Sequence, residues 1–149
     1  MVEQLNRQRV LAFLDDFSAG DIEGALGRCS ADVDFLTHAP IDILPHMGHR
    51  HGTAEVRQMW QTVHARYSGL RYEVPIVVAE GDRVAAYLRA FFKKRSNGRI
   101  VQFDMAVFFT LREGRIAQIR EVLDSFDVVQ QVLERDLAAL LAESRPDGA

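Results

Sequence analysis

The chain has 149 residues, of which 48% are hydrophobic and 26% charged, and its formal net charge is −3 at pH 7. This length and composition predict one globular domain over residues 1–149 with room for a substantial core. The mildly acidic net charge argues against a nucleic-acid partner, which would need a basic stripe on the protein. The sequence has no run of roughly 18 apolar residues, so we predict no membrane span.

The single cysteine and the first residues bear on the compartment. Cys29 is the only cysteine, so an intrachain disulfide is impossible. Residues 1–7 lack the uncharged apolar core of a signal peptide. We therefore expect a protein of the reducing cytoplasm, with no membrane or nucleic-acid partner, and we assign it no cofactor.

The N-terminal half predicts three helices around one short strand. The expected elements are helices over 2–18, roughly 22–29 and 53–67, a strand over 32–37 and a loop over 39–52. Val10, Phe13 and Phe17 recur at helical spacing in the first helix, and Trp60 belongs to a similar stripe in the third. Asp21 is placed to cap the second helix. The first and third helices should therefore each bury one apolar face.

The stretch from Arg71 to Asp124 is the most informative part of the sequence. It predicts four long strands over roughly 70–79, 82–95, 99–112 and 114–124, followed by a helix over 126–143 and a frayed tail over 144–149. The pair Asn97-Gly98 is a strong hairpin signal. This order predicts an α+β domain with helices on one face of an antiparallel sheet. Such a sheet twists and curls, which leaves a conical cavity with apolar walls beside the helices.

The two middle strands look apolar on both faces, although a sheet with one wet face should show polar residues at every second position. The outer face therefore also needs cover, and we expect a second copy of the chain to provide it. The protein is thus predicted to be a homodimer with contact residues Tyr87, Arg89, Phe91, Asp104 and Phe108. Within this set, Arg89 and Asp104 are expected to form a cross-strand pair that sets register or partner choice.

Several short motifs occur in a specific order along the chain. They are the segments 17–26, 30–33, 48–52, 80–84 and 112–116. With these motifs the chain resembles the nuclear transport factor 2-like superfamily, in its SnoaL-like and ketosteroid-isomerase-like branch, over about residues 5–128. The resemblance implies a cystatin-like roll, in which a strongly curved antiparallel sheet wraps around the N-terminal helices and forms a conical pocket. It leaves the activity open, because this superfamily includes isomerases, polyketide cyclases, dehydratases, hydrolases and non-catalytic binders.

The catalytic set of ketosteroid isomerases is missing from this chain. The resemblance matches Phe13 to their tyrosine donor and Val107 to their carboxylic-acid donor, so both groups that stabilise the enolate oxygen are absent. Their general base corresponds to Thr37, and a one-residue bulge would instead turn His38 into the cavity. We therefore predict no ordinary ketosteroid isomerase activity.

The catalytic set of limonene epoxide hydrolases is also incomplete. Those enzymes use an arginine flanked by two aspartates, and the matching residues are Leu88, Ala90 and Glu121. One carboxylate does not suffice both to activate water and to protonate an epoxide. We therefore do not expect an ordinary limonene epoxide hydrolase.

Glu121 is the leading candidate for an acid or base, with His38 and Thr37 as further catalytic candidates. Glu121 shares its strand face with Ile119 and Leu123, and a carboxylate against an apolar wall has a raised pKa. The alternatives are a wetted or arginine-paired glutamate at the mouth, and a His38 that bonds backbone at the strand end. The predicted ligand-binding wall consists of Phe13, Phe17, Phe35, Trp60, Leu88, Phe103, Met105 and Ile119.

Three histidines of the predicted loop have the chemistry of a metal site but not its spacing. His46, His49 and His51 are irregularly spaced, and Gly48 and Gly52 indicate a turning loop. Zinc needs three or four converging ligands, usually with support from a carboxylate or cysteine. We therefore predict no metal site.

Three classes of function remain open for this sequence. The first is an isomerase, cyclase or hydrolase that acts on a small hydrophobic molecule with Glu121, together with His38, as acid/base. The second is a module that binds such a molecule without turnover. The third is a dimeric protein-interaction domain, whose cavity would be filled by its own side chains.

Overall fold

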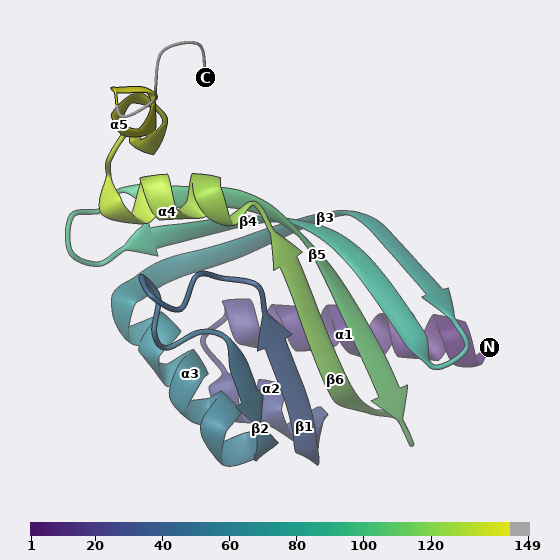
Figure 1. Cartoon of the computed structure of the whole chain (residues 1–149). Coiled ribbons are helices and arrows are strands. Elements are labelled where there is room, and N and C mark those ends of the chain that lie inside the picture. Colours follow the sequence, from purple (N-terminus) through teal and green to yellow (C-terminus); the bar gives the residue numbers. More distant parts are fainter. Residues whose placement is uncertain (144–149) are drawn as a thin grey trace.

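The computed structural model describes residues 1–143 and shows helices packed against one face of a curved, unclosed sheet (Figure 1). The strands are β1 (Cys29–Thr37), β2 (His49–His51), β3 (Tyr67–Glu80), β4 (Arg83–Lys94), β5 (Ile100–Arg112) and β6 (Arg115–Leu123). They form one six-stranded sheet in the order β2-β1-β6-β5-β4-β3. The helices are α1 (Val2–Ser18), α2 (Ile22–Gly27), α3 (Gly52–Arg66), α4 (Ser125–Leu133) and α5 (Leu137–Glu143). The predicted α+β class and curved sheet are confirmed.

The predicted antiparallel meander is confirmed for β3 to β6. The β5–β6 turn shows why these strands can reverse so tightly. Glu113 and Gly114 both have positive φ, 51° and 77°, between the paired residues Arg112 and Arg115. A two-residue turn with both φ angles positive matches the right-handed twist of the flanking strands.

The largest difference from prediction in the sheet lies at its β1 edge. β1 begins at Cys29 rather than Asp32, and it pairs in parallel with β6. The Ile116 amide donates to the Arg28 carbonyl at 2.9 Å, so the distant strand extends β1 toward its N-terminus. The segment His49–His51, predicted as loop, forms β2 and pairs antiparallel with β1. A three-residue strand is too short to leave a periodic pattern.

The predicted single helix over 126–143 is wrong, because the chain turns between α4 and α5. Glu134 at this turn has a left-handed φ of 55°. Its carboxylate accepts hydrogen bonds from Lys94 Nζ at 2.9 Å and from Asn97 Nδ2 at 2.6 Å. These contacts reach across the fold to β4 and the turn after it, so helical periodicity alone does not reveal the break. The tail predicted over 144–149 lies outside the described residues.

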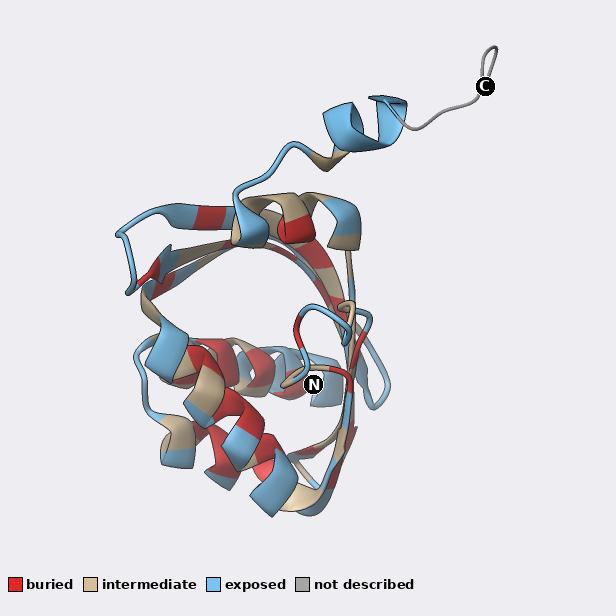
Figure 2. Cartoon of the chain, turned by 60° about the vertical axis from the view of Figure 1, so that its left-hand side comes forward, coloured by how far each residue is buried: buried red, intermediate tan, exposed pale blue. Residues whose placement is uncertain are grey.

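The buried faces of α1 and α3 are turned toward the concave side of the sheet (Figure 2). Val10 and Phe13 of α1 and Val56 and Trp60 of α3 are buried there. α4 lies across one end of the sheet, whereas α5 stands away from the body of the domain (Figure 2). Within residues 1–143, no helix has the length and apolarity needed to cross a membrane.

Candidate functional site

A cavity lies between α1, α3, the concave face of the sheet and α4. Its empty volume, which includes open solvent at the mouth, is about 960 Å³. Aromatic rings form much of the wall, and Trp60 packs against Phe13 and Phe17 at centroid distances of 5.6 and 5.3 Å. A mostly apolar concavity with few polar groups is the usual form of a small-molecule site.

The structure brings the predicted wall together. All eight residues of that prediction line the cavity, namely Phe13, Phe17, Phe35, Trp60, Leu88, Phe103, Met105 and Ile119. Val128 and Val132 of α4 complete it from above. Contact of these side chains with a ligand stays a prediction.

Glu121 lies on the cavity face of β6, between Ile119 and Leu123 in the alternating pattern of the strand. Within residues 1–143 its carboxylate has no hydrogen-bond or salt-bridge partner. Burial among apolar side chains disfavours the charged form and raises the pKa of Glu121 to about 7. Near neutral pH this carboxyl is therefore divided between its acidic and basic forms, so it can either donate or accept a proton.

Thr37, rather than His38, faces the cavity. Thr37 lies opposite Glu121 in the parallel β1–β6 register, and its side chain is only 2% exposed. Its hydroxyl oxygen is buried and has no hydrogen-bond partner within the described residues. His38 is exposed and lies outside the cavity wall, and its backbone amide donates to the Glu121 carbonyl at 3.1 Å. The bulge that would turn His38 inward does not occur, while its part in catalysis stays a prediction.

Three further polar residues line the cavity, His46, Tyr67 and Tyr72, and none of them was predicted as a site residue. The buried Nδ1 of His46 has no partner within residues 1–143. Burial, followed by the charges of Arg66 and Arg50, lowers the pKa of His46. Burial, followed by the nearby charge of Glu121, raises the pKa of Tyr72 well above its usual value. Alternation along β3 could have found Tyr72, whereas His46 lies on a loop without periodicity.

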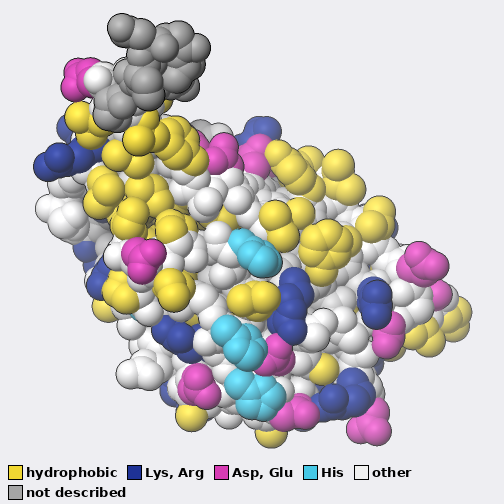
Figure 3. Space-filling model, in the orientation of Figure 1, with side chains coloured by type: hydrophobic (Ala, Val, Ile, Leu, Met, Phe, Trp, Pro, Cys, Tyr) yellow, Lys and Arg dark blue, Asp and Glu magenta, His cyan; other side chains and the backbone are white. Residues whose placement is uncertain are grey.

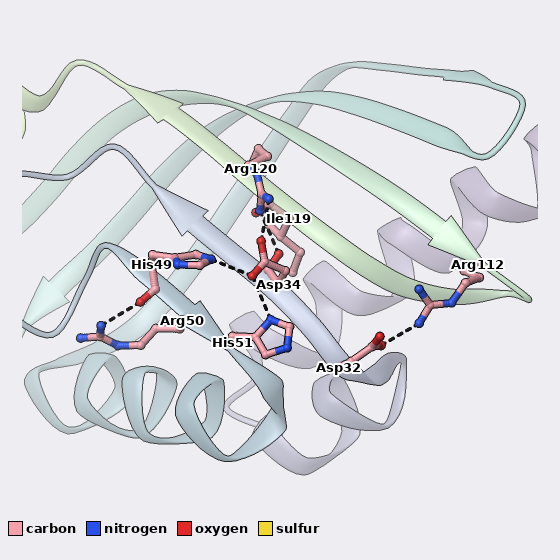
Figure 4. A network of polar contacts seen from close by, with 8 residues as sticks. All are labelled: Asp32, Asp34, His49, Arg50, His51, Arg112, Ile119 and Arg120. Atoms are coloured by element: carbon pink, nitrogen blue, oxygen red, sulfur yellow. Dashed lines mark hydrogen bonds and ion pairs between the residues drawn. The ribbon is translucent and has the colours of Figure 1, made fainter.

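The other two loop histidines belong to a polar cluster on the outside of the domain (Figure 4). His49 Nε2 and His51 Nδ1 lie 2.7 and 3.0 Å from the same Asp34 oxygen, and Arg120 donates to the second oxygen at 2.6 Å. Burial alone would raise the pKa of Asp34, but hydrogen bonds from His51, Arg120 and His49 outweigh it and lower the pKa to about 2. The cluster therefore fastens β1 to β2 and β6.

This cluster does not form a metal centre. Within residues 1–143 no three His, Cys, Asp or Glu side chains converge in a geometry that could hold a metal ion. The Asp34 oxygens already accept hydrogen bonds, and the Arg120 guanidinium beside them opposes a cation. Histidines, cations and carboxylates are interspersed on this face of the molecule (Figure 3).

The outer face of the sheet carries the predicted contact residues. Arg89 lies opposite Asp104 in register, with its Nε 3.4 Å from Oδ1, so the predicted cross-strand pair is confirmed. The Tyr87 hydroxyl also donates to Asp104. Phe108 is 52% exposed on the same face. Cross-strand neighbours join it into one apolar patch, which comprises Ile76, Val78, Ala85, Tyr87, Ala106, Phe108 and Val122.

Solved structures share this architecture. A protein from Rhodopseudomonas palustris, described as a candidate isomerase, is 27% identical with a TM-score of 0.76 and covers 85% of this chain and 93% of its own. A nuclear transport factor 2-like protein from Burkholderia pseudomallei is 19% identical, with a TM-score of 0.78 and coverage of 86% and 97%. A candidate polyketide cyclase from Xanthomonas campestris is 21% identical, with a TM-score of 0.77 and coverage of 89% and 99%.

These likenesses define the nuclear transport factor 2-like fold. The family model of the SnoaL-like domain matches residues 10–119, so the chain belongs to the SnoaL-like domain family. A comparison with curated protein sequences gives no match.

Proposed function

We propose that this SnoaL-like domain binds a small hydrophobic molecule in its cavity and moves a proton on that molecule with Glu121. The observation that carries the proposal is an unpaired carboxyl in an apolar cavity, with a pKa of about 7. A general acid or base works best when its pKa lies near the working pH. Isomerisation and cyclisation both require such a proton transfer at a carbon or oxygen of the substrate.

The similarity to a candidate isomerase and a candidate polyketide cyclase is in line with this reaction type. The cavity has no lysine or arginine in its wall within residues 1–143, so a strongly anionic substrate would lack a counter-charge. The aromatic rings of Phe13, Phe17 and Trp60 instead favour a ring-shaped or otherwise bulky apolar skeleton.

A binding module without turnover is the second candidate. The observation that favours it is the lack, within residues 1–143, of any side chain bonded to the Glu121 carboxylate. Catalytic groups are commonly held in one orientation by such a partner. Under this alternative Glu121 would contribute to affinity alone.

Hydrogen exchange on a bound ligand distinguishes the two candidates. The ligand that co-purifies with the full chain would be identified by native mass spectrometry and incubated with the protein in heavy water. We expect deuterium to replace a carbon-bound hydrogen of the ligand, and we expect Glu121→Gln to slow this exchange by about 10²–10⁴-fold. The matched control is Glu55→Gln, since Glu55 is exposed on α3. Equal exchange rates for wild type and Glu121→Gln would contradict the proposal.

We also propose that two copies associate through the outer face of the sheet. The support is the apolar patch around Phe108, flanked by the Arg89–Asp104 pair. A patch of this kind on both partners suits a two-fold symmetric interface. Light scattering should therefore give twice the chain mass for the wild type and the single-chain mass for Phe108→Glu. A monomeric wild type at high concentration would contradict it.

A further inference from the structure

The hydroxyl of Thr37 is, like His46 Nδ1, a buried polar group of the cavity wall without a hydrogen-bond partner in the described residues. The side chain is 2% exposed, and its oxygen has no hydrogen-bond partner within the described residues. A buried hydroxyl without a partner destabilises the folded state. Valine would have nearly the same shape without that cost. The hydroxyl therefore has a hydrogen-bonding capacity that the domain itself does not use.

The register of the sheet places this hydroxyl beside Glu121. Thr37 and Glu121 are direct neighbours across the parallel β1–β6 pair, and both side chains lie in the cavity wall. Neighbouring side chains on one face of a sheet lie about 5 Å apart at their Cβ atoms. A single oxygen atom of a ligand can therefore reach both groups.

We propose that Thr37 and Glu121 together form a clamp for one hydroxyl group on an uncharged apolar ligand, such as a phenol. This inference rests on the proposed ligand cavity, but not on turnover. A ligand hydroxyl donates its hydrogen to the Glu121 carboxylate and accepts a hydrogen bond from Thr37 Oγ1, so one group satisfies both side chains. An ether oxygen lacks the hydrogen and satisfies Thr37 alone.

Charges around the cavity select against ionised ligands. Within residues 1–143 its wall contains no lysine or arginine to receive an anion, and the carboxylate of Glu121 would repel one. Arg50 and Arg66 act electrostatically on His46 in the wall, so a cation would meet their positive field there. An uncharged hydroxyl avoids both penalties.

Three naphthalene probes test the clamp on the full chain by isothermal titration calorimetry near neutral pH. They are 2-naphthol, 2-methoxynaphthalene and 2-naphthoate, which share a ring system and differ in the oxygen group. We expect 2-naphthol to bind about tenfold more tightly than 2-methoxynaphthalene, and 2-naphthoate to bind most weakly. Equal affinities for the two neutral probes, or no binding of either, would overturn the proposal.

Variants at Thr37 show whether its hydroxyl donates a hydrogen bond to the oxygen of the probes. Thr37→Val should weaken the binding of both 2-naphthol and 2-methoxynaphthalene about fivefold to tenfold, because either oxygen can accept from the Thr37 hydroxyl, whereas Thr37→Ser should restore part of the affinity. Thr110→Val is the matched control, because Thr110 lies on β5 with its hydroxyl near Gln118 and outside the cavity wall. A loss of affinity in Thr37→Val that Thr37→Ser does not reverse would assign Thr37 a packing role and overturn the clamp.

The same variants give a readout in the absence of ligand. Because the unpaired hydroxyl destabilises the fold, Thr37→Val should raise the melting temperature of the free protein while it weakens 2-naphthol binding. A lower melting temperature in Thr37→Val would contradict the claim that the Thr37 hydroxyl has no hydrogen-bond partner in the free protein. If the probes bind as the clamp predicts but no deuterium exchange occurs, only the proposed proton transfer is contradicted. If exchange occurs but the two neutral probes bind equally well, only the clamp is contradicted.

Discussion

The two faces of the β1–β6 strand pair treat their polar groups in opposite ways. On the outer face, Asp34 has hydrogen bonds from three side chains, among them Arg120. On the inner face, the side chains of Thr37 and Glu121 have no hydrogen-bond partner within residues 1–143. Asp34 and Thr37 lie three positions apart on β1, and Arg120 and Glu121 are consecutive on β6. The first arrangement stabilises the fold, whereas the second would be satisfied by the proposed ligand hydroxyl.

The carboxyl groups of the two faces respond to pH in opposite directions. The pKa of Glu121 is raised from 4.5 to about 7 by burial, and that of Asp34 is lowered from 3.8 to about 2 by its donors. A raised pKa makes the folded protein less stable as pH rises, and a lowered pKa makes it less stable as pH falls. Each group can therefore be examined in its own pH window.

The largest expected effect on stability is that of Glu121→Gln at alkaline pH. Between pH 4.5 and about 7 the folded protein retains a proton that the unfolded chain has lost, so wild-type stability falls across this window. The variant lacks this titration. Its free energy of unfolding should exceed that of wild type by about 3 kcal/mol more at pH 8 than at pH 4. Urea unfolding of both proteins at both pH values measures this difference in unfolding free energy. The same difference at pH 4 and pH 8 would contradict the raised pKa of Glu121.

His46 titrates within the same cavity and acts in the other direction. Its lowered pKa makes the folded protein less stable as pH falls. This contribution is present in wild type and in Glu121→Gln, so it cancels to first order when the two are compared. The double variant with His46→Gln checks that cancellation.

A smaller effect is expected from Asp34→Asn on the outer face. Its contribution is fully present above pH 3.8 and is lost as pH falls through about 2. The variant should therefore lose about 2 kcal/mol of unfolding free energy at neutral pH, while ligand affinity is unchanged. Asp32→Asn is the control, since its ion pair with Arg112 is exposed to solvent and should contribute little to stability. Equal losses of unfolding free energy in both variants would show that the hydrogen bonds to Asp34 stabilise the fold no more than an exposed ion pair does.

The smallest effect concerns the hydroxyl on the inner face. Thr37→Val should gain about 1 kcal/mol of unfolding free energy, because it removes an unpaired buried hydroxyl and retains the volume. Thr37→Ser should show no such gain. Chemical unfolding of the ligand-free protein gives both values, and a loss of stability in Thr37→Val would show that the hydroxyl has a partner in the fold.

The sequence predicted the parts of the fold that repeat along one element. Alternation identified the meander, and helical spacing placed Phe13, Phe17 and Trp60 in the cavity wall. Together with the family resemblance, alternation also placed Glu121 on the inner face. These features depend on periodicity, which a single sequence displays.

The features that the sequence left out depend on distant partners. β2 and the parallel β1–β6 pairing arise from contacts between remote strands, and the end of α4 depends on Lys94. The loop that brings His46 to the cavity shows no periodic pattern of apolar residues from which its position could be predicted. Whether a polar group is paired, like Asp34, or unpaired, like Thr37, follows only from the assembled structure.

Hydrophobic side chains also gather at the end of the molecule that carries α4 and α5 (Figure 3). α4 is fixed there by Lys94, whose Nζ donates to the carbonyls of Gln131 and Val132 at 2.9 and 2.8 Å. Val132 itself lines the cavity. The roof of the cavity is therefore fastened to the sheet by polar contacts.

The protonation of Glu121 in the folded, ligand-free protein is the most direct test. Carbon-13 NMR of the side-chain carboxyl, assigned by its loss in Glu121→Gln, follows that proton across pH. The titration midpoint should lie at about 7. A midpoint near 4.5, the value of an ordinary glutamate, would show that water or an unseen partner reaches the group and would contradict the proposed acid/base role.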